Sequence, residues 1–76
     1  MINKSNWDKF AKQQPYAMLM VKKLAKERYE FTGSIDLASE EQRKRFSLLR
    51  QIIDENGLLY GTDTYSEDLK TIINAP

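Results

Sequence analysis

The residues whose spacing could do chemistry are cations on two stretches with helical periodicity. Lys22 and Lys26 lie four residues apart with Lys23 beside them, while Arg43 and Arg50 lie seven apart. Such spacings place side chains on one edge of a helix. Several Lys and Arg side chains on one surface can follow a nucleic-acid backbone, each displacing a counterion from the phosphates. The candidate phosphate-binding residues are Lys22, Lys23, Lys26, Arg43, Lys44 and Arg50.

Two tyrosines near the predicted helix ends, Tyr16 and Tyr29, stand beside these cations and complete the candidate nucleic-acid-binding set. Single-strand binders stack unpaired bases on such rings. The alternative is that each ring is buried and only its hydroxyl reaches water. The sequence is compatible with both base stacking and ring burial.

The cations also have an alternative interpretation as intrahelical ion pairs on a solvated face. Oppositely charged residues recur at four-residue spacing on the second and third predicted helices, and each such pair would contribute only ~0.3–0.5 kcal/mol. The pairs are Lys23–Glu27, Lys26–Glu30, Glu40–Lys44, Glu41–Arg45 and Arg50–Asp54.

Charge is distributed unevenly along the chain. Residues 1–50 carry eleven cations and six anions, a net charge of +5, whereas residues 51–76 carry one cation and five anions, a net of −4. The total of +1 hides this polarity. A concentrated cationic field attracts polyanions even when the total charge is near zero.

The elements that must position these residues are predicted to be helices. The 76 residues predict a single all-α domain, 1–76, built as a small bundle of four short helices over 5–14, 15–31, 39–56 and 64–74. A chain of this size buries roughly 60% of its unfolded surface, which leaves no deep interior for a large active site.

Local signals set these boundaries. Ser5 is the predicted cap of the first helix, and Pro15 suits the first turn of the second. Gly33 is the predicted terminator of the second helix. Two capping boxes, Ser39 with Gln42 and Thr64 with Glu67, open the third and fourth helices, and Gly57 ends the third.

Apolar spacing predicts which side chains form the core. Trp7, Phe10, Phe31 and Phe46 lie on apolar stripes, and Ile35 and Leu37 are expected to tuck under the core. On the second helix the predicted buried side comprises Ala17, Met20, Val21, Leu24 and Phe31. Leu19 falls on the lysine side, where with Met18 it forms an alternative, protein-docking surface.

Composition excludes several kinds of chemistry. The sequence contains neither cysteine nor histidine, so thiolate chemistry and the usual zinc ligand and general base are absent. The acidic stretch from Asp54 places Gly57 fourth, where a calcium-binding EF-hand loop needs glycine sixth. We therefore expect no catalytic residues, no metal ion and no cofactor. No apolar run approaches the ~20 residues of a membrane span, so we expect no membrane partner and a cytoplasmic location.

The order of signals, from Ser5 and Pro15 to the capping boxes at Ser39 and Thr64, resembles a known family. The plan is similar to the small helical accessory proteins encoded beside the UvsW helicase in T-even phages, which are in turn similar to the helicase-and-RNase-D C-terminal module. The resemblance implies an auxiliary role in phage DNA replication, recombination or repair. It also implies a helicase or another replication protein as partner.

Together these observations predict a non-enzymatic accessory module that binds nucleic acid weakly through a basic face. Single-stranded or branched DNA is the expected ligand. The alternative is a protein-binding adaptor or inhibitor that docks on a larger enzyme. The two interpretations differ in their salt dependence, because phosphate contacts weaken as salt rises.

Overall fold

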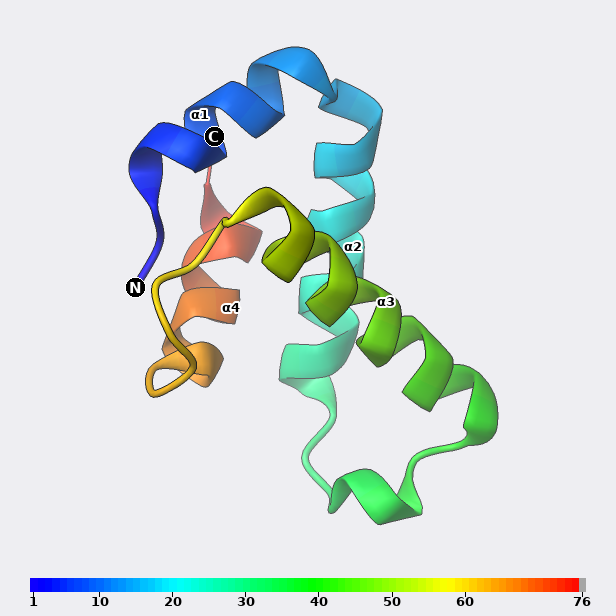
Figure 1. Cartoon of the computed structure of the whole chain (residues 1–76). Coiled ribbons are helices and arrows are strands. Elements are labelled where there is room, and N and C mark those ends of the chain that lie inside the picture. Colours follow the sequence, from blue (N-terminus) through cyan, green and yellow to red (C-terminus); the bar gives the residue numbers. More distant parts are fainter. Residues whose placement is uncertain (76) are drawn as a thin grey trace.

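The computed structural model describes residues 1–75 and has four α-helices. They are α1 (Lys4–Gln13), α2 (Pro15–Glu30), α3 (Glu40–Asn56) and α4 (Tyr65–Asn74), with a short 3₁₀ turn, η1 (Ile35–Leu37), before α3. Figure 1 shows α1 and α2 meeting at a sharp bend, and α3 running back from the η1 end toward α1. The predicted small all-α bundle is confirmed, and residues 1–75 contain no strand beyond one isolated bridge between Ile2 and Leu59.

The first helix starts earlier than predicted because a different residue caps it. Asn3, not Ser5, is the N-cap: its backbone is extended and its side-chain oxygen accepts a hydrogen bond from the Asn6 amide at 3.2 Å. This satisfies one of the amides that a helix start leaves without a partner. Pro15 occupies the first turn of α2 as predicted, separated from α1 by Gln14 alone.

The second helix ends at Glu30, before the predicted glycine terminator. Phe31 already has an extended backbone, and its ring lies 5.7 Å from that of Phe46 on α3. Positive φ angles in residues 1–75 occur only at Gly57 and Gly61, so the predicted terminator Gly33 does not end α2 through a left-handed conformation. Phe31 therefore leaves the helical conformation and packs its ring against α3.

The turn that follows does not tuck under the core. Ile35 and Leu37 are 43% and 79% exposed, which contradicts their predicted burial, whereas the neighbouring Ala38 is buried. In Figure 1 this turn lies at the end of α2 and α3 furthest from α1. Both side chains therefore face solvent rather than the apolar cluster of the core.

The third helix matches its prediction at both ends. Ser39 and Gln42 form the reciprocal capping box, and Gly57 ends the helix in the left-handed conformation at φ 59°. At α4 the predicted capping box is wrong, because the side chain of Thr64 makes no cap bond. Its hydroxyl instead donates to Asp68 at 2.9 Å and accepts from the amino group of Met1.

The core is organised around α2, which packs against all three other helices and most extensively against α4. Met18 is buried on α2, whereas Met20 is 43% exposed, so the predicted position of Met20 on the buried side is wrong. The stripe runs through Met18, Val21 and Ala25 instead. The central apolar cluster comprises Trp7, Phe10, Met18, Val21, Leu24, Ala25, Leu49, Ile53, Leu58, Leu69 and Ile72.

Candidate nucleic-acid interface

Three arginines from two helices converge on one surface hollow of about 410 Å³. Arg28 comes from α2, and Arg43 and Arg50 come from α3. Aromatic and small side chains complete the lining, and among residues 1–75 no carboxylate lines the hollow. The remaining lining residues are Ile35, Phe46, Ser47 and Tyr65. A cationic hollow with aromatic walls has the chemistry that phosphates and bases require.

Two of these guanidinium groups lie over aromatic rings. Arg28 is 5.4 Å from the ring centre of Phe46, and Arg50 is 5.1 Å from that of Tyr65. Such contacts are attractive because the ring face is electron-rich. They restrict two flexible side chains before any ligand arrives, which lowers the entropy lost on binding.

The arginines differ in how far their charge is already neutralised. Arg50 forms an ion pair with Asp54 at 3.2 Å, as the four-residue spacing predicts. Arg43 is exposed and forms no ion pair within residues 1–75. Arg50 still has donors to offer because a guanidinium carries five N–H groups. Arg43 is therefore the most available cation of the hollow.

The phenol of Tyr65 stays neutral at the edge of the hollow. Burial raises the pKa of Tyr65, and the nearby Arg50 and Arg28 offset only part of that increase. An ionised phenolate would neutralise part of the arginine charge. A phenol is already protonated at neutral pH, so Tyr65 cancels none of the arginine charge there.

The predicted lysines of α2 do not line this hollow. Lys22 is half-buried, and its ammonium group donates to the carbonyl of Ala75 beyond the end of α4. Lys23 and Lys26 are exposed. At about 100° per residue, all three point more than about 100° away from Arg28 around the helix axis. Of the six predicted phosphate-binding cations, Arg43 and Arg50 are the two that line one hollow together.

The ion pairs on α3 are partly those predicted. Lys44 pairs with Glu40 at 3.7 Å, both side chains being well exposed. Arg45, however, pairs with Glu27 of α2 rather than with Glu41, through two hydrogen bonds of 2.7 and 2.6 Å. The hydrogen bonds from Arg45 hold the pKa of Glu27 below its ordinary value, despite the opposing effect of desolvation. The predicted Glu41–Arg45 pair is wrong because the bidentate partner on α2 is within reach.

The predicted tyrosines are open to solvent. Tyr16 is 86% exposed and Tyr29 is 46% exposed, which leaves both rings accessible. Neither lines the arginine hollow. The alternative docking surface is reduced, because Leu19 is exposed but Met18 lies in the core.

Arg28 and Tyr65 were not among the predicted site residues. Arg28 lies four residues after Leu24 and seven after Val21, so the sequence already places a cation on the core-facing stripe near a helix end. A charged residue on an otherwise apolar stripe was the sequence feature from which Arg28 could have been identified. Tyr65 lies at the start of the predicted fourth helix, four residues before Leu69, and nothing local relates it to Arg50 on another helix.

Residues 1–75 hold no cluster of three or more acidic side chains arranged to bind a metal ion. No helix in this range is long and apolar enough to cross a membrane. No protein-family model, no curated protein and no solved structure matches this chain.

Proposed function

We propose that this chain is a non-enzymatic module that binds single-stranded nucleic acid through the arginine hollow. The observation that carries the proposal is the convergence of Arg28, Arg43 and Arg50 on one hollow without a lining carboxylate. Arginine forks onto phosphate oxygens and stacks on unpaired bases. Such a hollow on a small module suits a splayed single strand, whose bases are free to enter it.

The resemblance to the small accessory proteins encoded beside the UvsW helicase extends this proposal to a biological role. It makes the chain an auxiliary protein in DNA replication, recombination or repair that works beside a helicase. The exposed cations Lys23, Lys26 and Lys44, together with Tyr16 and Tyr29, are then secondary contacts outside the hollow. Carboxylates already pair with Lys44 and Arg50, so the surface should bind nucleic acid weakly. Weak binding suits an accessory protein.

The number of arginines predicts the salt dependence. With three phosphate contacts, log K against log salt for a single strand should have a slope of about −2, a roughly twentyfold loss between 50 and 200 mM. Fluorescence anisotropy with labelled oligo-dT, duplex and branched DNA at several salt concentrations measures the slope and the preference. No binding to any of them at low salt would refute the proposed function.

Substitution then locates the contact. Arg43→Ala should weaken binding and make the salt slope shallower by about 0.7, because one phosphate contact is lost. Arg43 makes no ion pair in residues 1–75, so its removal should leave the melting temperature unchanged. Lys12→Ala is the matched control, since it removes one exposed cation outside the hollow. Equal losses in the two variants would assign binding to diffuse charge rather than to the hollow.

A further inference from the structure

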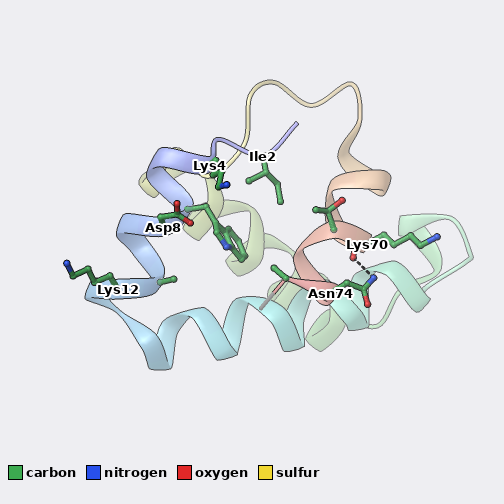
Figure 2. A pocket seen from close by; sticks show the side chains of 10 residues that line it. Ile2, Lys4, Asp8, Lys12, Lys70 and Asn74 are labelled. Atoms are coloured by element: carbon green, nitrogen blue, oxygen red, sulfur yellow. Dashed lines mark hydrogen bonds between the residues drawn. The ribbon is translucent and has the colours of Figure 1, made fainter.

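A second surface feature lies between α1 and α4, away from the arginine hollow. It is a groove of about 1010 Å³ whose apolar lining is shared by the start of the chain, α1 and the residue after α4. Figure 2 shows Ile2 between the labelled side chains of α1 and those of α4. The apolar lining residues are Ile2, Trp7, Ala11 and Ala75.

The groove lies between two helices, α1 and α4, that each pack mainly on α2. Two polar side chains of its α4 lining already donate within the helix: the Thr71 hydroxyl donates to the Glu67 carbonyl, and the Asn74 amide donates to the Lys70 carbonyl. These groups can be covered without losing their hydrogen bonds. Covering a satisfied polar group costs much less than burying an unpaired one.

The rim of the groove is cationic. Lys4, Lys12 and Lys70 line it against a single carboxylate, Asp8. The three lysines are exposed and form no ion pair within residues 1–75. In Figure 2 the ammonium groups of Lys12 and Lys70 lie at opposite ends of the site. The groove therefore combines an apolar floor with positive charge at both ends.

We infer that this groove binds an acidic amphipathic helix of a partner protein. Such a helix lays its apolar face into a groove and leaves its charged flanks at the rim. Lysines at opposite ends fit a partner with well-separated carboxylates. A fatty acid offers one carboxylate and would leave one end unpaired. The surface and the residues are distinct from those of the arginine hollow.

Trp7 gives a direct readout, because it lines the groove and is the only tryptophan in the chain. The probe is a synthetic peptide of about 18 residues, or about five helical turns. It is built from Leu, Ala and Glu with its leucines on one face, and it contains no aromatic residue. Titration should change the Trp7 emission saturably, and the affinity should fall as salt rises. The controls are the same peptide with Lys in place of Glu, a scrambled peptide without an apolar face, and oleate.

Variants identify the groove as the binding site. Reversing both end charges, with Lys12→Glu and Lys70→Glu together, should weaken peptide binding at least about tenfold, because attraction becomes repulsion. Ala11→Glu should also abolish binding by placing a charge in the apolar floor. The matched controls are Lys23→Glu with Lys26→Glu, which make the same charge change elsewhere, and Gln13→Glu on α1 outside the groove. Circular dichroism verifies that each variant is folded.

Three results would overturn the inference: no Trp7 response to the acidic peptide, equal responses to the acidic and basic peptides, or tighter binding of oleate than of the peptide. Insensitivity of binding to both Ala11→Glu and the end-charge reversal would overturn it as well. The inference does not depend on the proposed function. Arg43→Ala should retain full peptide binding, so failure of one proposal is distinguishable from failure of the other.

Discussion

At the scale of single residues, the three arginines of the hollow have different surroundings and therefore different expected contributions. Arg28 and Arg50 are held over aromatic rings, so replacing either also removes packing within the protein. Arg43 has neither a ring nor a carboxylate partner in residues 1–75. Its substitution therefore separates ligand binding from stability most cleanly.

Gly57 is the backbone position where a side chain would cost most. It has a φ of 59°, and an added Cβ would lie 2.7 Å from the Asn6 side-chain nitrogen, which donates to the Gly57 carbonyl at 2.9 Å. Gly57→Ala should lower the free energy of unfolding by about 2–3 kcal/mol, combining left-handed strain with a disturbed hydrogen bond.

Gly61→Ala is the matched control for this prediction. Gly61 has a φ of 68°, but nothing lies within 4 Å of an added Cβ. Only the backbone strain of about 1 kcal/mol should remain. Urea denaturation measures both variants, and equal losses would mean that the Asn6 contact contributes nothing.

At the scale of elements, helix starts depend on which backbone conformation precedes them. Ser5 is a favourable cap residue, but it lies inside α1, where its side chain is exposed. Asn3 takes the cap position because its backbone N–H donates to the Leu58 carbonyl at 2.9 Å. This hydrogen bond holds the chain extended where it enters the helix. A tertiary contact thus decides between two local candidates.

The two candidate caps can be tested by alanine substitution. Asn3→Ala should lower the free energy of unfolding by about 1 kcal/mol, since the Asn6 amide loses its partner. Ser5→Ala should be neutral or slightly stabilising, by up to about 0.5 kcal/mol, because alanine is the better helix former. Thermal denaturation followed by circular dichroism measures both. A larger loss for Ser5→Ala would contradict the cap at Asn3.

At the scale of the whole molecule, stability depends on a core that α2 shares with its three neighbours. A domain of this length is expected to have a total stability of about 4–11 kcal/mol. Ile72 of α4 is fully buried, within the most extensive helix packing of the fold. Truncating this one side chain should therefore remove a large share of the total free energy of unfolding.

Ile72→Ala should therefore cost about 2–5 kcal/mol and leave a marginally folded protein. Leu37→Ala is the control, because Leu37 is 79% exposed in the η1 turn and its truncation should change stability by less than about 0.5 kcal/mol. Thermal unfolding distinguishes the two. A neutral Ile72→Ala would mean that α4 is not part of the core.

In the folded molecule the positive charge of residues 1–50 does not form one continuous surface. Cations of the basic segment divide between the arginine hollow, the lysines of α2 and the rim of the groove. Lys70 of the acidic segment joins Lys4 and Lys12 at that rim. Charge that is continuous in the sequence becomes two separate sites in space.

The sequence by itself determined the features that depend on neighbours within one helical turn. Examples are the capping box at Ser39, the stop at Gly57, the proline at the start of α2 and the ion pairs Glu40–Lys44 and Arg50–Asp54. Each involves residues close along the chain, so local geometry specifies it. These features were sufficient for the helical fold class.

Only the tertiary structure decided which helix faces meet. The packing of α2 against α3 brings Arg28 close to Arg43 and Arg50, and it pairs Arg45 with Glu27. The position of α4 places the Tyr65 ring under Arg50. Helical spacing fixes where a side chain stands around its own axis, but not how that axis is rotated relative to another. That rotation follows from how the apolar side chains of all four helices pack together. The candidate site consists of contacts between helices, and this is why the sequence identified two of its three arginines but not the hollow.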